Sequence, residues 1–413
     1  MLTRQMFSSI LRSQRHLPRL ITGSRNFSEN DASSASSSSG SDSELESSTD
    51  SSEMRVEDIP VDAYVLPSRN DGFTEGTFLQ MPKNLFDRLY GIYGFEPYQK
   101  ELFEVLDDTG IMIRDPYFQL VDYINKTNFD LPAIRYVLYG RYGSGKTYIL
   151  NSMAHYGYHH NFVIVQLSAP HEWVNEPHEM ELSESRPGRL DYPLNAALAL
   201  KHFKSQNSAI LKRLNLRTTK KYTWSIREAA EKGDPLVNVV DHGIGRMKHS
   251  SDCYAVLLKE LKLLANSGAC KLMVLCDSIN VLYDKPKVKH PDGRVISVEE
   301  ITLSRAFMKL LQHDWKNGLL IASVNKKTDN LRSRLDSYFP KHLLTDRGFD
   351  DLDPFIPIEV KDYSEIETDS CLDYYTQRNF LNRPPAKTKA GRDEIKFVTA
   401  NNPQEVYKFC SAL

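Results

Sequence analysis

The stretch that decides the fold of this 413-residue chain is Tyr136-Val-Leu-Tyr-Gly-Arg-Tyr-Gly-Ser-Gly-Lys-Thr147. Its second part matches the pattern G-x-x-x-x-G-K-[ST], in which the backbone N–H groups of a glycine-rich loop surround phosphates. We expect Lys146 to reach the β- and γ-phosphates and the Thr147 hydroxyl to ligate Mg²⁺. An apolar strand-type run precedes the loop and a helical pattern follows it, which a chance glycine-rich turn would not require. The stretch therefore predicts a nucleotide-binding site.

A second motif lies in Lys271-Leu-Met-Val-Leu-Cys-Asp277, an apolar strand that ends in a carboxylate. We expect Asp277 to hold Mg²⁺, or a water bound to it, beside Thr147. The alternative is an aspartate that only caps a turn. The next residue is Ser278, where many hydrolysing P-loop ATPases carry a glutamate, and a hydroxyl is too weak a base to activate water. The amide of Asn280 could only orient a water molecule, so we expect slow hydrolysis or none unless another residue positions the water.

A third motif is Gly318-Leu-Leu-Ile-Ala-Ser-Val-Asn325, a strand with a polar end. In the AAA+ type of P-loop fold this end, called sensor 1, contacts the γ-phosphate, and Asn325 is the candidate here. The alternative is an ordinary turn residue. The segment Asn325-Lys-Lys-Thr-Asp329 also resembles the guanine-reading N-K-x-D pattern, but it contains one residue too many.

The fold class follows from strands that alternate with helical segments, which predicts a mostly parallel sheet flanked by helices. Gly145, Asp277 and Asn325 then fall at the carboxyl ends of strands, where such sheets bind ligands. We expect strands at 136–139, 162–167, 271–277, 318–325 and 353–360, helices at 78–89, 98–106, 115–125, 145–156 and 253–264, and a loop at 169–187. Gly157 is expected to cap the helix after the phosphate loop. Segment 54–130 leads into the nucleotide-binding domain at 131–362, which contains a helical insertion at 191–265 and is followed by a C-terminal helical region at 363–413 that is a candidate lid.

The N-terminus differs from the rest of the chain. Residues 1–27 carry five arginines and no acid, with apolar residues at helical spacing, which predicts a mitochondrial transit peptide. The alternative is a basic tail that binds nucleic acid or a surface. Among the 26 residues of 28–53, thirteen are serine and seven are acidic, so we expect this segment to be disordered.

Charge and cysteine content narrow the class of protein. The formal net charge is −2, and none of the five cysteines forms a C-x-x-C pair, so neither a zinc ribbon nor a disulfide framework is indicated. No apolar run is long enough for a transmembrane helix. Residues 192–227 form a basic run with eight cations and no acid. This run is a candidate for contact with RNA. The alternative is a solvated helical face. These cations are Lys201, Lys204, Lys212, Arg213, Arg217, Lys220, Lys221 and Arg227.

Five segments together resemble the family of the mitochondrial small-subunit ribosomal protein known as death-associated protein three. They are Ala133 to Thr147, Lys221-Tyr-Thr-Trp-Ser-Ile-Arg-Glu228, Glu231-Lys-Gly-Asp-Pro-Leu236, Asp277-Ser-Ile-Asn280 and Leu352-Asp-Pro-Phe-Ile-Pro-Ile358. The resemblance covers about residues 75–413.

The resemblance implies an AAA+-like domain that binds GTP or GDP with Mg²⁺, ATP not being excluded, within the head of the mitochondrial small ribosomal subunit. Carried over by motif, Gly140 to Thr147 bind phosphates, and Thr147 and Asp277 bind Mg²⁺. With the sensor 1 candidate Asn325 and the adjoining Tyr148, the expected nucleotide-binding residues are Gly140, Arg141, Tyr142, Gly143, Ser144, Gly145, Lys146, Thr147, Tyr148 and Asn325. The implied partners are small-subunit rRNA and neighbouring ribosomal proteins, with contact to the large subunit as a further expectation and with no membrane and no second copy of the chain. Members are also linked to apoptosis.

The main alternative is an active NTPase or switch of AAA+ type in the mitochondrial matrix. Such an enzyme needs an arginine finger, for which Arg332 and Arg334 are the candidates. A small-molecule kinase is disfavoured, because the sequence offers no recognisable acceptor pocket.

Overall fold

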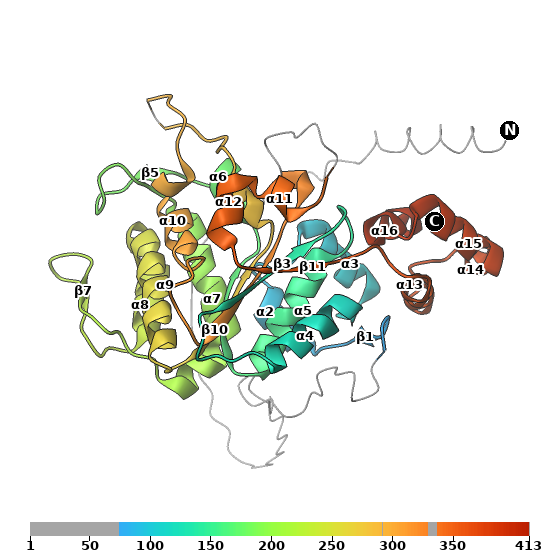
Figure 1. Ribbon diagram of the computed structural model, residues 1–413, viewed down its shortest axis with the longest axis horizontal. Helices are drawn as coiled ribbons and strands as arrows, with labels where there is room; N and C mark the ends of the chain where they lie inside the picture. Colours follow the sequence, from blue (N-terminus) through green and yellow to red (C-terminus); the bar gives the residue numbers. More distant parts are fainter. Residues whose placement is uncertain (1–73, 291, 329–336, 413) are drawn as a thin grey trace, which may run out of the picture. The chain divides into compact units, whose positions relative to one another are not determined.

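Five parallel strands form the central sheet of the computed structural model, which describes residues 74–290, 292–328 and 337–412. Their order across the sheet is β11 (Ile356–Glu359), β3 (Ile134–Tyr139), β10 (Gly318–Ser323), β9 (Lys271–Cys276) and β4 (Phe162–Leu167). All four pairings between neighbours are parallel. The predicted α/β fold with a parallel sheet is confirmed, and Figure 1 shows helices around the sheet.

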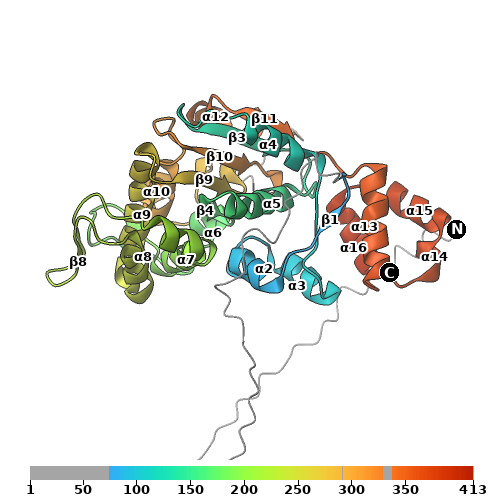
Figure 2. The ribbon, with the colours of Figure 1, turned by 90° about the horizontal axis from the view of Figure 1, so that it is seen from below.

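The sheet is buried on both faces because successive strand residues enter two different cores. Val137, Val274 and Ala322 belong to one core, whereas Leu138, Leu275 and Ile321 belong to the other. The first core is covered by α7 (Pro193–Leu214), α8 (Leu236–Gly245), α9 (Ser250–Asn266) and α10 (Thr302–Met308). The second is covered by α2 (Lys83–Tyr90), α3 (Pro97–Leu106), α4 (Asp115–Asn125) and α5 (Lys146–His159), as Figure 2 shows from below.

A third core joins the C-terminal helices to the segment before the phosphate loop. It contains Leu372 and Val406 from the C-terminal region and Leu106 and Met112 from the N-terminal side. The C-terminal helices are α13 (Glu365–Gln377), α14 (Pro384–Lys387), α15 (Lys389–Thr399) and α16 (Pro403–Ser411), so the helical expectation for this region is confirmed. The two termini of the described chain therefore stabilise one another.

The smaller elements complete the chain. They are β1 (Phe78–Leu79), β2 (Ile111–Met112), α6 (Pro170–Asn175), β5 (Glu181–Leu182), β6 (Leu190–Asp191), β7 (Tyr222–Thr223), β8 (Ala229–Ala230), η3 (Met247–His249), η4 (Ile279–Tyr283), η5 (Val298–Glu300), η6 (Lys326–Thr328), α11 (Pro340–Leu343) and α12 (Thr345–Leu352). The expected helical content of the insertion is confirmed, although Tyr222 lies in a short hairpin of β7 and β8.

Three local expectations are wrong. Helix α5 runs past Gly157 to His159, and a Cβ at Gly157 would lie 2.8 Å from Met273 Sδ. This glycine therefore lets the helix approach the sheet and does not end it. The expected loop at 169–187 contains α6 and β5, and the expected helix at 78–89 begins as strand β1 and becomes helical only at Lys83.

Several expectations concern segments outside the described residues. They are the transit peptide at 1–27, the serine-rich segment at 28–53, and Asp329, Arg332 and Arg334. Among the described helices, none has the length and apolar character that crossing a membrane requires.

Candidate functional site

The phosphate loop connects β3 to α5, and three glycines with positive φ shape it. The φ angles of Gly140, Gly143 and Gly145 are 150°, 83° and 96°. A Cβ at Gly140 would lie 2.2 Å from the carbonyl oxygen of Val360, and a Cβ at Gly143 would lie 2.5 Å from Asn402 Oδ1. Both the backbone conformation and the close approach of neighbours therefore require glycine here.

Lys146 is the buried cation of the loop, with 6% of its surface exposed. Its Nζ donates to the carbonyl oxygens of Gly140 at 3.0 Å and Arg141 at 2.9 Å. Burial lowers the pKa of Lys146 to about 8, and the nearby carboxylates of Asp277 and Asp362 oppose that shift. The loop carbonyls thus hold the ammonium group where phosphate oxygens could take their place.

Thr147 and Asp277 come together, as their motifs predicted. Thr147 Oγ1 donates to Asp277 Oδ2 at 2.6 Å, and the Ser323 hydroxyl donates to the other carboxylate oxygen. Ser323 Oγ in turn accepts from the backbone N–H of Ser278 at 2.9 Å. A hydroxyl and a carboxylate fit Mg²⁺, which uses few protein oxygens and completes its octahedron with phosphates and water. Ser323 was missed by sequence reasoning, although a polar residue at the end of a buried strand was a usable signal.

The residues after Asp277 supply no base for water activation. Ser278 is buried in a left-handed conformation with φ of 51°. Asn280 is fully buried, and its Oδ1 accepts from the N–H of Asn325 at 2.9 Å while its Nδ2 donates to the Asn325 carbonyl at 3.1 Å. The amide of Asn280 therefore holds the backbone at Asn325. It is not available to orient water, which is the role that the sequence had left open for it. Asn325 itself lines the same cavity as Thr147 and Asp277.

The C-terminal helices hold the outer side of the phosphate loop. Asn402 Nδ2 donates to the carbonyl of Tyr142 at 3.0 Å, and the N–H of Gln404 donates to the carbonyl of Gly143 at 3.2 Å. Arg141, an exposed loop residue, pairs with Asp362 at 2.8 Å. The ends of these contacts lie more than 200 residues apart in the sequence, so no local pattern could predict them.

Arg114 is the strongest of these supports. Its Nη1 donates to the carbonyl of Ser144 at 2.6 Å, and its Nε donates to Glu367 Oε1 at 2.9 Å. The side chains of Arg114 and Glu367 are each only 5% exposed. A buried ion pair thus connects the phosphate loop to helix α13.

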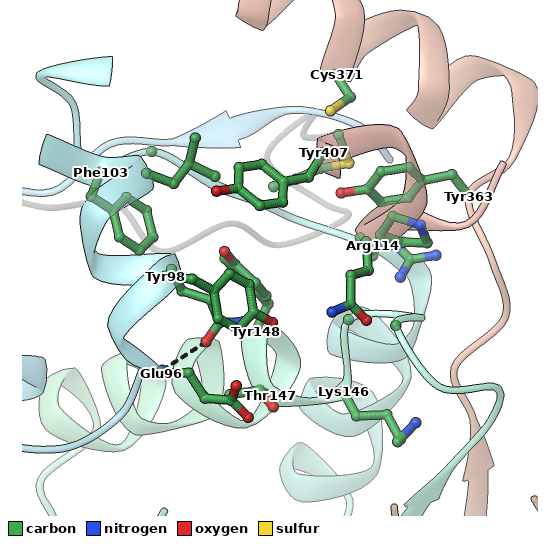
Figure 3. Close-up of a pocket in the computed structure, with 18 of the residues that line it drawn as sticks. Glu96, Tyr98, Phe103, Arg114, Lys146, Thr147, Tyr148, Tyr363, Cys371 and Tyr407 are labelled. Carbon is green, nitrogen blue, oxygen red and sulfur yellow. Dashed lines mark hydrogen bonds between the residues drawn. The ribbon is translucent and has the colours of Figure 1, made fainter. Parts of the chain in front are cut away.

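An aromatic cavity opens beside Lys146 and Thr147. Figure 3 shows Tyr98, Phe103, Tyr148, Tyr363 and Tyr407 around it, from α3, α5 and the C-terminal region. Flat aromatic walls next to a phosphate loop suit the base or sugar of a nucleotide. Of the predicted loop residues, Tyr142, Gly143, Gly145 and Tyr148 also line this cavity, whereas Gly140, Arg141 and the buried Ser144 do not.

Comparisons with known proteins address the family of the chain. A family model described as mitochondrial ribosomal death-associated protein 3 matches residues 111–409. The small ribosomal subunit protein mS29 of Bos taurus is 35% identical over 310 residues, which cover 75% of this chain and 77% of that protein. The mS29 protein of Mus musculus is 33% identical over 347 residues, covering 84% and 88% of the two chains. Among solved structures, the crystal structure of Cdc6p from Pyrobaculum aerophilum matches with 13% identity and a TM-score of 0.31 over 79% of this chain and 63% of that chain, which is too distant to support an argument.

Proposed function

This chain belongs to the family of mitochondrial ribosomal death-associated protein 3, and on that premise we propose that it is a structural, nucleotide-holding component of the mitochondrial small ribosomal subunit. Its place of action is the mitochondrion, within the ribosome. Its direct partners are then small-subunit rRNA and neighbouring ribosomal proteins. Contact with the large subunit and a link to apoptosis extend the proposal on the family resemblance alone.

One observation supports the nucleotide proposal above all. The side chains suited to bind phosphates and those suited to bind Mg²⁺ lie together at one edge of the sheet. Lys146 would hold the β- and γ-phosphates, and Thr147 and Asp277 would hold Mg²⁺. The aromatic cavity would take the base, for which the resemblance favours guanine. When bound, the nucleotide would bring negative charge to the buried Lys146 and so stabilise its ammonium form.

A holding role is favoured over turnover for two reasons. The residue directly after Asp277 is Ser278 and not a carboxylate. The amide of Asn280, the other residue suggested by the sequence, is hydrogen-bonded to the backbone of Asn325. In addition, Arg114, Asn402 and Gln404 fix the loop from outside. These contacts support a loop that keeps one geometry, since they would have to break for the loop to move.

The test is to identify and follow the nucleotide. Protein isolated from mitochondria is denatured, and the released nucleotide is identified by chromatography; guanine nucleotide is expected. With purified full-length chain, GTP and Mg²⁺ at 100 times the dissociation constant should raise the unfolding free energy by about 2.7 kcal/mol. Lys146→Ala should abolish this gain, while exposed Lys387→Ala should keep it.

Three outcomes would contradict the proposal. Release of no nucleotide, together with a melting temperature that GTP does not change, would remove the nucleotide-holding role. Single-turnover hydrolysis at the rate of active ATPases, lost in Lys146→Ala, would favour the matrix NTPase or switch instead. Absence of the chain from salt-washed mitochondrial small subunits would remove the ribosomal role.

A further inference from the structure

A second cavity, distant in sequence from the phosphate loop, lies between α9, α10 and the loop before β6. Its volume is about 390 Å³, and the cations that line it are Arg186, Arg189, Lys259, Lys262, Arg305 and Lys309, here called the basic pocket. One carboxylate, Asp252, shares the lining. We propose that the basic pocket binds the phosphate groups of a single RNA strand, an inference that rests on the proposed ribosomal function.

The charge of the basic pocket is only partly neutralised by carboxylates of the described part of the chain. Arg186, Arg189, Arg305 and Lys309 make no ion pair with a described carboxylate. Lys259 lies over the ring of Tyr222 at 5.9 Å. Only Lys262 is paired, with Asp314 at 2.5 Å. Clustered cations without partners are the electrostatic footprint of a phosphate-binding surface.

The acid that stands between the two α9 lysines points elsewhere. Glu260 is fully buried, and it accepts hydrogen bonds from the backbone N–H of Thr219 at 2.6 Å and the Thr219 hydroxyl at 2.9 Å. The hydroxyl of Tyr222 also donates to it. Helix α9 therefore buries its negative charge and leaves Lys259 and Lys262 at the basic pocket.

The cations of the basic pocket oppose one another. Burial lowers the pKa of Lys309 most, and Arg305, Arg189 and Lys259 lower it further. Burial likewise lowers the pKa of Arg189, with Arg305 and Arg186 as the next causes. A bound anion would reduce this mutual repulsion and so stabilise the basic pocket.

A buried hydroxyl points to a ligand independently of the charges. Thr302 lines the cavity, is 2% exposed, and its Oγ1 has no hydrogen-bond partner among the described residues. Buried hydroxyls are normally bonded, because an unsatisfied one costs about 1–3 kcal/mol. Rotation of the Thr302 side chain about χ1 would present this hydroxyl to a phosphate oxygen or a ribose hydroxyl in the cavity.

The rest of the lining favours RNA over an acidic protein segment. Val256, Ala306 and Leu310 form apolar wall, and Tyr222 adds an aromatic ring. A nucleotide presents a charged phosphate and a flat apolar base together, which matches this mixture. A carboxylate side chain would pair with the cations and leave the apolar wall uncovered.

The basic run of residues 192–227 is a weaker candidate, because much of its charge is used internally. Lys204 pairs with Asp241 at 2.6 Å and Lys221 with Glu231 at 2.5 Å. Arg217 Nη1 donates to the Gly233 carbonyl at 2.8 Å, and Arg213 donates to Asn161. None of the six cations of the basic pocket belongs to that run.

The test uses the purified full-length chain and a fluorescein-labelled 12-nucleotide RNA of mixed sequence, with anisotropy as readout. Each phosphate contact to a single strand contributes about 0.7 to the slope of log affinity against log salt. Arg305→Ala combined with Lys309→Ala should therefore flatten the slope by about 1.4 and weaken binding roughly 25-fold at 0.1 M salt. Thr302→Val should weaken binding without changing the slope, since it removes a hydrogen bond and no charge.

The matched control is Lys387→Ala combined with Lys389→Ala, which removes two exposed cations from α14 and α15. It should leave both affinity and slope unchanged. An equal loss in this control, or a loss confined to Lys201→Ala with Arg227→Ala in the basic run, would overturn the assignment. Binding of a polyglutamate peptide that depends on Arg305 and Lys309, without binding of RNA, would assign the basic pocket to an acidic protein.

Failure of the inference is distinguishable from failure of the proposed function. If the pocket variants bind RNA normally while the wild-type chain sediments with mitochondrial small subunits, only the inference fails. If the wild-type chain is absent from those subunits, the ribosomal function fails whatever the anisotropy shows. Melting curves of each variant, with GTP and without it, confirm that the fold and the phosphate loop are intact.

Discussion

The phosphate-loop site and the basic pocket are both rich in cationic side chains, but these side chains differ in the partners that the chain itself provides. At the phosphate loop, Lys146 is held by two carbonyls and Arg114 by a carboxylate and a carbonyl of the same chain. In the basic pocket, Arg305 and Lys309 have no ion-pair partner in the part of the chain that the structure describes. One site is complete within the chain, whereas the other lacks its anions.

This difference separates two ways of preparing a site for phosphate. A loop whose groups are already bonded keeps its shape without a ligand, and a ligand gains only the difference between new and old bonds. Unpaired cations destabilise the isolated chain through their mutual repulsion. When an anion binds, no existing ion pair has to break, so the whole interaction energy contributes to binding. The first arrangement suits a nucleotide that is held permanently, and the second suits assembly onto RNA.

The largest expected effect comes from breaking the internal pairing at the phosphate loop. Arg114→Ala leaves the carboxylate of Glu367 buried without its partner, which costs about 3–5 kcal/mol. The unfolding free energy, measured by urea denaturation, should fall by that amount, and affinity for GTP should fall as well because the Ser144 carbonyl loses its donor.

The control is Arg141→Ala at the same loop. The pair of Arg141 with Asp362 is exposed, with 60% of the arginine side chain accessible, so its loss should cost about 0–1 kcal/mol. Arg114→Met combined with Glu367→Met should recover part of the stability, since no buried charge is then left alone. Equal losses of unfolding free energy for Arg114→Ala and Arg141→Ala would show that the buried pair of Arg114 and Glu367 does not hold the phosphate loop.

The parts of this architecture that the sequence predicted are those with local causes. The strand at 162–167 and the helix at 115–125 have the predicted bounds, because a short apolar run and a proline in the first helical turn act over a few residues. The contact of Thr147 with Asp277 was also accessible, since both motifs end at the same edge of a parallel sheet.

What could not be predicted depends on contacts between distant segments. Asn402 and Gln404 reach the phosphate loop only because the C-terminal helices pack on the segment around Met112. The basic pocket collects cations from three separate segments, none of which has an unusual local charge, while the charged run at 192–227 is largely paired. Gly157 matched a helix cap in its local pattern, but its packing against Met273 decided its role.

A second prediction asks whether two buried histidines are closed to water in the folded chain. His155 on α5 lies in the helix that follows the phosphate loop, and His202 on α7 packs edge-on against the ring of Tyr93. Burial lowers the pKa of each to about 3, with His159 and Lys100 as the respective second causes. The unfolded chain therefore binds more protons than the folded one between pH 6.5 and pH 3, so stability is fully present above pH 6.5 and falls as the pH falls.

The expected loss is about 1.4 kcal/mol per pH unit for each group, or about 2 kcal/mol per histidine between pH 6.5 and pH 5. His202→Leu should remove about that share of the pH dependence in urea denaturation, because both of its ring nitrogens are buried without a described partner. His178→Leu, at an exposed position, is the matched control. An unchanged slope in His202→Leu would mean that water reaches His202 in the folded chain.

The smallest effect has the opposite sign and tests the basic pocket in the isolated protein. Lys309→Ala removes one of several mutually repelling cations and breaks no described ion pair, so it should raise the unfolding free energy by up to about 0.5 kcal/mol at low salt. Because screening weakens this repulsion, the gain should shrink at 1 M salt. Lys396→Ala, which removes a cation paired with Asp369 at 2.9 Å, should instead lower stability. A loss of stability in both variants would mean that the chain neutralises the basic pocket itself, and the contrast between a complete site and an incomplete one would then disappear.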